Sequence, residues 1–283
     1  MPERTDRFGA VPGAYQQTCM TLDERTFSLE SLPPRSDNTI TVFQGTNAAG
    51  GMAGRTGVAV WNSGILLTRL LDELHRINPS IFERKSIVEL GCGTALASIA
   101  LSKLGAASVI ATDNNPEVLA LARRNIERNN SSTESNTGTI TTSALQWGPL
   151  DATEYEADVI VGSDLTYNSG SWVALAETMS AILRPGGIVI YLTLGHSGFN
   201  VGGELGGFLS VAENAGLRVL SKDDDEWRDN IISGSDNDGQ KVVDVNKLLA
   251  ERVVRTAEER AVIDANGGGK AVLLGKKRYS SKR

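Results

Sequence analysis

From Ser86 onward, short apolar segments alternate with segments whose apolar residues recur at helical spacing. Strands are predicted over residues 86–90, 108–112, 139–145, 158–163, 188–194, 217–220 and 271–275. Helices are predicted between several of them, beginning near Thr94, at the N-cap Asn115 and near Ser171. Almost continuous apolar strands that alternate with helices are typical of a parallel sheet covered on both faces. The alternation therefore predicts an α/β fold.

The rest of the chain is predicted to surround this core. Two alternating segments predict a hairpin over residues 25–44, and a leucine stripe predicts a helix over 63–77, with His75 as a surface or boundary residue. Less regular features are a flexible arm over 1–24, a turn at 184–187, a glycine-rich loop at 195–207 and an insertion over 222–269 with a charged helix near 245–264. No linker separates two domains, so residues 25–283 are predicted to form one domain.

The segment Glu89-Leu90-Gly91-Cys92-Gly93-Thr94 joins the first core strand to its helix. Glycines let the backbone approach a ligand, and a helix N-terminus offers free N–H groups. A dinucleotide loop needs a third glycine where this chain has Leu96. Glu89 would also repel a pyrophosphate, whereas it suits a ligand with an ammonium and a sulfonium group. The loop therefore predicts S-adenosylmethionine as the cofactor, and a simple tight turn is the alternative.

A second carboxylate stands where a ribose is expected. Asp113 ends the second core strand, 113 − 91 = 22 residues after the first glycine, and such an acid accepts hydrogen bonds from ribose hydroxyls. The predicted cofactor-binding residues are Trp61, Glu89, Gly91, Gly93, Asp113, Asn114, Trp147 and Ser163. Each tryptophan could equally be an ordinary core residue, and Asp113 a plain turn residue.

The tetrapeptide Asp164-Leu165-Thr166-Tyr167 follows the strand after the expected reversal of strand order, where ligands bind in open α/β sheets. A carboxylate and an aromatic ring can bind and cover a cation. Methyltransferases of nucleobase amines carry prolines inside this tetrapeptide, so Leu165 and Thr166 disfavour a planar acceptor. Asp164 and Tyr167 are the predicted catalytic residues, with a strand-end cap and ordinary packing as their alternatives. His196, after the 188–194 strand, is a weaker candidate.

A lysine acceptor must lose a proton before it can be methylated. Its unperturbed pKa of about 10.4 means that roughly 4–5 kcal/mol is needed to supply the neutral amine at pH 7. Desolvation and an adjacent sulfonium both favour the neutral amine. Asp164 could therefore orient the amine for in-line displacement, without a dedicated strong base.

Composition excludes several other function classes. Acidic residues exceed basic ones by 34 − 28 = 6, which disfavours nucleic acid as a partner. Two cysteines and two histidines are too few for a zinc cluster or a disulfide framework. No apolar run approaches the roughly 18 residues of a membrane span, and the N-terminus lacks a signal peptide. We expect a monomeric cytoplasmic protein, also present in the nucleus, with no metal and no membrane partner.

Together these segments resemble the family-16 seven-strand methyltransferases, the methyltransferase-like protein lysine methyltransferases. The resemblance rests on the hairpin ending in Gln44, Thr56 to Trp61, the Glu89 loop, Asp113, Leu145 to Gly148 and the D-x-x-Y tetrapeptide at Asp164. It implies a Rossmann-like sheet of order 3-2-1-4-5-7-6 with an antiparallel seventh strand, S-adenosylmethionine as methyl donor and a protein lysine as acceptor. Known substrates of the family include translation elongation factors and Hsp70-type chaperones.

Two departures and two alternatives accompany the resemblance. Asn62 follows the tryptophan where many members have an acid or proline, and the 222–269 insertion is longer than expected. Methylation of a small-molecule amine or hydroxyl is one alternative function. A catalytically silent binding module that keeps the cofactor fold is the other.

Overall fold

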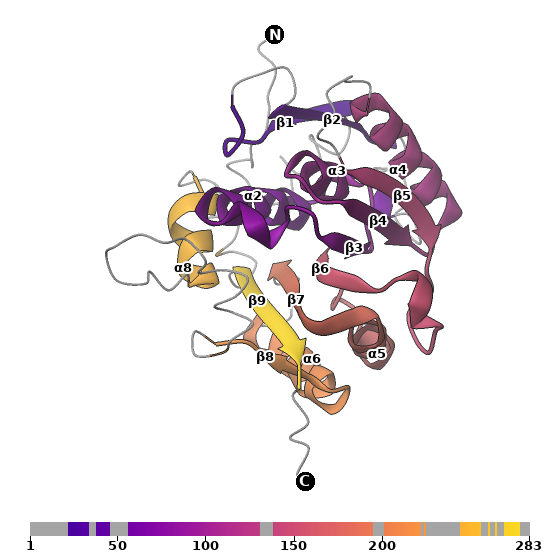
Figure 1. The fold of residues 1–283 in the computed structure, drawn as a ribbon, viewed down its shortest axis with the longest axis vertical. Helices are drawn as coiled ribbons and strands as arrows, with labels where there is room; N and C mark the ends of the chain where they lie inside the picture. The colour runs from indigo at the N-terminus through magenta and orange to yellow at the C-terminus, as the bar shows by residue number, and fades with distance from the viewer. Residues whose placement is uncertain are drawn as a thin grey trace.

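The computed structural model describes residues 22–33, 38–45, 56–130, 138–194, 201–221, 224, 244–255, 260, 264 and 269–277. In these ranges, β1 (Glu24–Ser28) and β2 (Thr39–Phe43) form an antiparallel hairpin, and the other strands form one seven-stranded sheet. Figure 1 shows the hairpin beside α4 (Pro116–Asn129), near one edge of that sheet. The predicted hairpin and α/β core are both confirmed.

The large sheet has the order β5-β4-β3-β6-β7-β9-β8. Its strands are β3 (Ser86–Leu90), β4 (Ser108–Asp113), β5 (Thr139–Ala144), β6 (Ala157–Ser163), β7 (Leu183–Leu194), β8 (Leu217–Val219) and β9 (Gly269–Lys276). Only β9 runs antiparallel to its neighbours, β7 and β8. Numbered in chain order from β3, this is the predicted order 3-2-1-4-5-7-6 with an antiparallel seventh strand.

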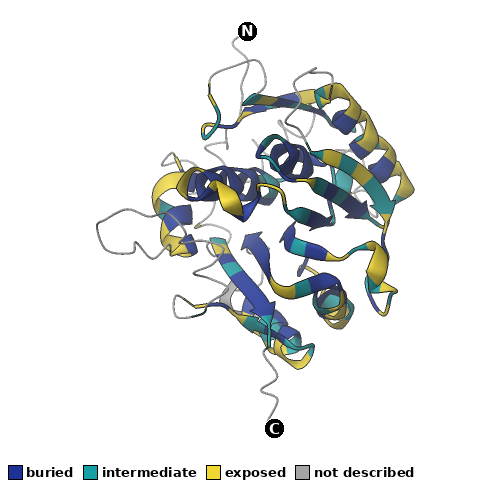
Figure 2. Ribbon diagram, viewed as in Figure 1, coloured by how far each residue is buried: buried dark blue, intermediate teal, exposed yellow. Residues whose placement is uncertain are grey.

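Helices cover both faces of the sheet. One face packs against α2 (Asn62–Ile77), α3 (Leu96–Lys103), α4, α8 (Val245–Leu248) and the π-helical turn η8 (Leu249–Val253). The other face packs against α5 (Trp172–Ile182) and α6 (Val201–Asn214). Successive strand residues alternate between the two cores, as Ile87 and Val88 do on β3. Figure 2 shows the central strands buried between these layers, whereas the edge strand β5 has no buried residue.

Within the described ranges, single-turn 3-10 helices lie in the connections between longer elements. They are η3 (Thr56–Val58), η4 (Pro79–Ile81), η5 (Ala152–Glu154) and η6 (Ser169–Ser171). No helix of the described residues is both long and apolar enough to cross a membrane.

Two asparagines of α4 hold the hairpin against the core. Asn125 accepts a hydrogen bond from the backbone N–H of Phe43 (2.7 Å) and donates to the Phe43 carbonyl (3.1 Å). Asn129 makes the same pair of bonds with Thr41, at 3.0 and 2.8 Å. These side chains satisfy backbone groups along the edge of β2, which its hairpin partner leaves unpaired.

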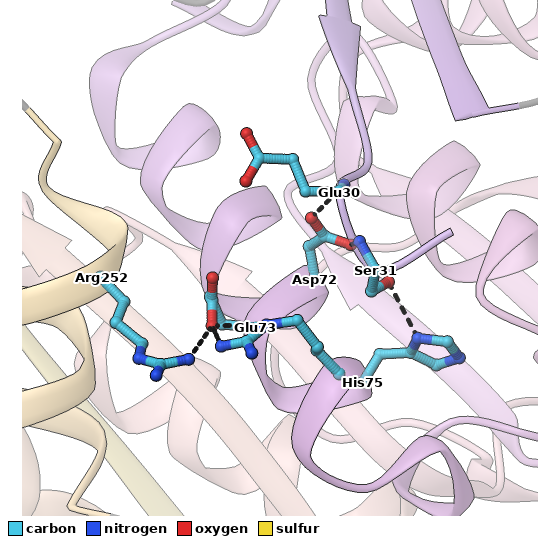
Figure 3. Close-up of polar contacts among 7 residues, drawn as sticks. Glu30, Ser31, Asp72, Glu73, His75 and Arg252 are labelled. Carbon is cyan, nitrogen blue, oxygen red and sulfur yellow. Dashed lines mark hydrogen bonds and ion pairs between the residues drawn. The ribbon is translucent and has the colours of Figure 1, made fainter. Parts of the chain in front are cut away.

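Helix α2 holds the other end of the hairpin, as Figure 3 shows. Asp72 accepts hydrogen bonds from the backbone N–H groups of Glu30 (2.7 Å) and Ser31 (3.1 Å). The Ser31 hydroxyl lies 2.9 Å from Nδ1 of His75, which is only 8% exposed. The expectation that His75 is a surface or boundary residue is therefore wrong, because the chain that follows β1 covers it.

The same helix contacts the C-terminal part of the chain. Glu73 forms an ion pair with Arg252 (3.5 Å), also drawn in Figure 3, and Arg69 donates a hydrogen bond to the Val253 carbonyl (3.1 Å). One helix thus connects the hairpin, the sheet and the segment around η8.

Two local predictions are wrong. Residues 184–187 are not a turn before a strand, because β7 already begins at Leu183, which pairs with Ala157 of β6. An irregularity separates this pair from the next one, Val159 with Ile188. The second half of the expected glycine-rich loop is helical, since α6 already begins at Val201. The first half of that loop, most of the 1–24 arm and most of the 222–269 insertion lie outside the described residues, so the domain boundaries stay predictions.

Candidate active site

Two glycines with left-handed backbone shape the loop that follows β3. Gly91 has φ +62° and Gly93 has φ +52°, conformations that residues with side chains rarely adopt. A Cβ atom at Gly91 would lie 2.6 Å from Cδ2 of Leu165. A Cβ atom at Gly93 would lie 3.2 Å from the carbonyl oxygen of Gly57. Both predicted loop glycines are thus required by conformation and by close neighbours.

Glu89 is a buried carboxylate on β3, directly before this loop. It is 6% exposed, and its Oε2 accepts hydrogen bonds from the backbone N–H (2.9 Å) and hydroxyl (2.5 Å) of Ser98 on α3. Burial raises the pKa of Glu89 to about 7, against the opposing effect of the Ser98 bonds, and the charge of Asp113 adds a smaller increase. A cation bound nearby would favour the ionised form. The environment therefore fits a cationic ligand and is unfavourable for an anionic one.

Asp113 ends β4 and is bonded to the same loop. Its Oδ1 accepts a hydrogen bond from the backbone N–H of Asn115 (3.0 Å), and its Oδ2 accepts a longer one from the N–H of Gly93 (3.4 Å). Burial raises its pKa, while hydrogen bonds from the backbone of Asn115, Gly93 and Asn114 lower it. Asn114 is exposed, and Asn115 caps α4 as predicted. The predicted ribose acceptor is therefore in contact with the predicted cofactor loop.

The two predicted tryptophans lie near the loop from different segments. Trp61 donates a hydrogen bond from Nε1 to the carbonyl of Thr56 (2.7 Å). Thr56 begins η3, whose Gly57 lies so close to the loop that its Cβ would be 3.4 Å from Cα of Gly93. Cζ2 of Trp147 would lie 4.0 Å from a Cβ atom at Gly91. Both side chains are half-buried.

Asp164 follows Ser163, the half-buried last residue of β6, and reverses the chain there. Its φ of +51° is left-handed although it has a side chain. Its N–H donates to the Leu192 carbonyl (3.0 Å), and its Oδ1 accepts from the Leu194 N–H (2.7 Å) and the Thr193 hydroxyl (3.0 Å). The end of β7 therefore fixes the position of this predicted catalytic carboxylate.

Leu165 brings the tetrapeptide against the cofactor loop. Its Cδ2 occupies the space beside Gly91, and its Cδ1 would lie 2.8 Å from a Cβ atom at Gly162. Because both neighbours are glycines, the leucine is accommodated and 6% exposed. This contact joins the predicted donor and acceptor sites, and sequence reasoning gave Leu165 no such role.

Sequence reasoning also missed a buried tyrosine under the tetrapeptide. The hydroxyl of Tyr191, on β7, accepts hydrogen bonds from the backbone N–H groups of Leu165 (2.9 Å) and Thr166 (3.1 Å). A polar-tipped residue inside the apolar run of β7 was the available signal. By contrast Tyr167, the other predicted catalytic residue, is 58% exposed. The tetrapeptide thus runs from a fixed carboxylate to an accessible phenol.

These contacts gather the predicted site at one edge of the sheet. Glu89, Asp113 and Asp164 lie at or near the carboxyl ends of β3, β4 and β6, which are parallel neighbours around the reversal of strand order. Cys92, inside the loop, is buried as a packing residue. His196 lies outside the described residues. Glu89 and Asp113 lie beside the tight loop, and Asp164 belongs to the tetrapeptide that packs against this loop through Leu165. This arrangement is suited to a cationic donor and an amine acceptor.

Comparisons with known proteins bear on the same segment. A family model described as lysine methyltransferase matches residues 43–197, more than half of the chain and a range that includes every predicted site residue. A ribosomal protein L11 methyltransferase of Teredinibacter turnerae is 33% identical over 103 residues, covering 36% of this chain and 31% of that protein. The mouse protein-lysine N-methyltransferase EEF2KMT is 27% identical over 173 residues, covering 58% of this chain and 50% of that protein.

The chain thus spans about a third to a half of the length of the curated relatives that it matches. Among solved structures, a TehB-like SAM-dependent methyltransferase from Corynebacterium glutamicum is 15% identical with a TM-score of 0.47. That match covers 75% of this chain and 88% of the other.

Proposed function

The chain belongs to the lysine methyltransferase family, and we propose that it is a methyltransferase that transfers a methyl group to the amine of a lysine in a protein substrate. The observation that carries the proposal is the contact of Leu165 with Gly91, which brings the tetrapeptide that begins with Asp164 against the cofactor loop. The mouse relative is described as a protein-lysine N-methyltransferase and supports the same acceptor.

S-adenosyl-L-methionine is the cofactor of this reaction and supplies, when bound, a methyl group on a positively charged sulfur. Glu89 and the loop around Gly91 and Gly93 would hold its amino-acid part, and Asp113 its ribose. The residues present fit the group, because a buried carboxylate with a pKa of about 7 is stabilised by a cation. A site built for phosphates would instead place a positively charged side chain at the position of Glu89.

Asp164 is proposed to orient the lysine amine. A carboxylate that is already bonded through Oδ1 to the end of β7 cannot rotate freely, so an amine hydrogen-bonded to it is held in one direction. Burial of the lysine and the positive charge of the cofactor lower the cost of the neutral amine, which is roughly 4–5 kcal/mol in water at pH 7. The exposed ring of Tyr167 is proposed to cover the aliphatic part of the lysine.

Transfer of a labelled methyl group to a cell extract tests the proposal. We expect a radiolabelled gel band that depends on the added protein and that yields methyl-lysine on acid hydrolysis. The same extract filtered free of protein is the control and should acquire no label. Label in the filtrate, or a labelled band without methyl-lysine, would contradict the acceptor that we propose.

The remaining features of the proposal concern partners and location. Elongation factors and Hsp70-type chaperones are the substrate classes to examine first, and the monomeric state and the cytoplasmic and nuclear location stay predictions. A labelled band cut from the gel and identified by mass spectrometry would name the substrate and its lysine.

A further inference from the structure

Thr166 is the buried centre of the acceptor tetrapeptide. It is 1% exposed, and each of its polar groups has a partner. Its N–H donates to the Tyr191 hydroxyl (3.1 Å), and its carbonyl accepts from Nε1 of Trp172 (2.8 Å). Its hydroxyl lies 2.9 Å from the Tyr191 hydroxyl and 2.5 Å from Oε1 of Glu204. Three side chains from β7, α5 and α6 thus converge on one residue.

The donors and acceptors in this cluster have one consistent arrangement. The Tyr191 oxygen already accepts the N–H bonds of Leu165 and Thr166, and the Thr166 hydroxyl donates to Glu204. The Tyr191 proton therefore goes to the Thr166 oxygen, which leaves Glu204 as the final acceptor. Burial raises the pKa of Tyr191, so the phenol keeps the proton that it must donate.

Helix α6 contributes three residues to the surroundings of Thr166 and its partners. Glu204 lies in its first turn and is buried, at 7% exposed. One turn later, a Cβ atom at Gly207 would lie 2.6 Å from Cζ3 of Trp172. The missing side chain leaves room for the indole that bonds Thr166. Phe208 follows and packs against Tyr191, with ring centroids 5.9 Å apart.

The hydrogen bonds around Thr166 help to hold Asp164, whose backbone conformation is strained. A residue with a side chain at φ +51° is in a sparsely populated backbone conformation, which persists only where the surroundings hold it. The bonds from Tyr191 and Glu204 hold the two residues that follow, Leu165 and Thr166. Without them, the backbone could relax and carry the carboxylate away from its position at the end of β7.

We propose that Glu204, together with Tyr191, is a positioning residue for methyl transfer, which acts through Thr166 to fix Asp164 and Tyr167 at the acceptor site. The inference rests on the proposed function and deepens it. It gives α6 a part in setting the geometry of the acceptor while leaving the cofactor loop to other residues.

Three variants and one control test the proposal by kinetics and cofactor binding. Glu204→Leu removes the final acceptor at similar volume, and Glu204→Gln keeps an acceptor oxygen. Thr166→Val removes the hydroxyl without changing the shape of the side chain. Glu213→Gln is the matched control, since it lies on the same helix with an exposed side chain paired to Lys277. For each purified protein we would measure kcat, the Kd for S-adenosylmethionine and the melting temperature.

The expected result is a separation of kcat from cofactor binding. Glu204→Leu and Thr166→Val should lower kcat about tenfold or more, because small misplacements of reacting groups cost that much, while the cofactor Kd changes less than about threefold. Glu204→Gln should recover kcat to within about threefold of the original protein. If Glu204→Leu and Thr166→Val lower only the melting temperature and keep their kcat, the positioning role is wrong.

Hydrogen exchange gives a readout that does not depend on activity. The amides of Leu165 and Thr166 should exchange at least about tenfold faster in Tyr191→Phe than in the original protein, because their acceptor has been removed. Unchanged exchange in that variant would overturn the proposal. Absence of methyl-lysine formation by the original protein would instead overturn the proposed function, while the exchange result would still decide whether the cluster holds the tetrapeptide.

Discussion

Gly91 shows at the scale of one residue why a motif glycine cannot be replaced. Its left-handed backbone and its contact with Leu165 are separate constraints, and other glycines in the chain have only one of them or neither. Gly186 has φ +78° with open space around it, and Gly64 lies in α2 with nothing within 4 Å. Gly186 and Gly64 therefore serve as controls for substitutions of Gly91.

Gly91→Ala should weaken S-adenosylmethionine binding at least about tenfold, measured by calorimetry, because the new Cβ atom forces Leu165 or the loop to move. Gly186→Ala should cost only about 1 kcal/mol of stability, from backbone strain alone, with no effect on binding. Gly64→Ala should raise stability by about 0.5–1 kcal/mol. Equal binding by Gly91→Ala and the original protein would contradict the assignment of this loop.

Glu89 predicts an unusual dependence of stability on pH. Its pKa is about 7 in the folded protein against an ordinary value of 4.5, so the folded state holds more protons than the unfolded state between these values. Stability should therefore fall by about 3 kcal/mol as pH rises through this window, and Glu89→Gln should remove that fall. Chemical denaturation of both proteins at several pH values measures the difference. A parallel loss in the two proteins would show that Glu89 is not responsible.

The same carboxylate should make cofactor binding pH-dependent. A bound cation favours ionised Glu89, so binding at pH 7 should release a fraction of a proton and tighten as pH rises from about 6 to 8. Calorimetry in buffers of different ionisation enthalpy detects the released proton. The Glu89→Gln variant should release a smaller fraction of a proton on binding. It should bind S-adenosylmethionine at least about tenfold more weakly, because the charge-assisted contact is lost.

At the scale of elements, sequence periodicity predicted the core strands well and irregular segments poorly. The strand over 86–90 matches β3 because a buried parallel strand is a short apolar run, whose limits are visible in the sequence. The glycines of 201–207 predicted a loop, yet this segment is helical, since Gly207 accommodates Trp172 and tertiary packing outweighs helix propensity. The start of β7 was missed because its pairing with Ala157 is nonlocal.

The hairpin illustrates how one element can act on another. Asn125 is fully buried and, besides its bonds to Phe43, donates a hydrogen bond to the carbonyl of Thr94 at the end of the cofactor loop (3.0 Å). Asn129 bonds Thr41 in the same way, but its side-chain N–H group also donates to the carbonyl of Asn125 (2.7 Å) rather than to that of Thr94. The first asparagine thus connects the hairpin to the predicted cofactor site.

Asn125→Ala should destabilise the protein by about 2–4 kcal/mol, because it leaves buried backbone groups of the hairpin and the loop unpaired. It should also weaken cofactor binding, whereas Asn129→Ala should lower stability without changing the Kd. Urea denaturation and calorimetry on the two variants provide the comparison. Identical cofactor affinities would mean that the hairpin does not support the loop.

At the scale of the whole molecule, the site is assembled from segments that are distant in sequence. The loop glycines, Asp113 and the tetrapeptide could be predicted, because each follows a recognisable strand at a known spacing. Tyr191 and Glu204 could not, because their roles depend on which side chains β7 and α6 bring beneath Thr166. Local patterns predict the groups that face a ligand, whereas the groups that support them are visible only in three dimensions.

The most direct test of the account is a paired measurement on Asp164→Asn: the Kd for S-adenosylmethionine and the rate of methyl-lysine formation. Asparagine keeps the Oδ1 acceptor for Leu194 and Thr193 and the tolerance for left-handed backbone, so the fold should be unaffected. We predict a cofactor Kd within about threefold of the original and a rate about 100-fold lower, because the carboxylate that orients the amine is gone. An unchanged rate of methyl-lysine formation would contradict the account.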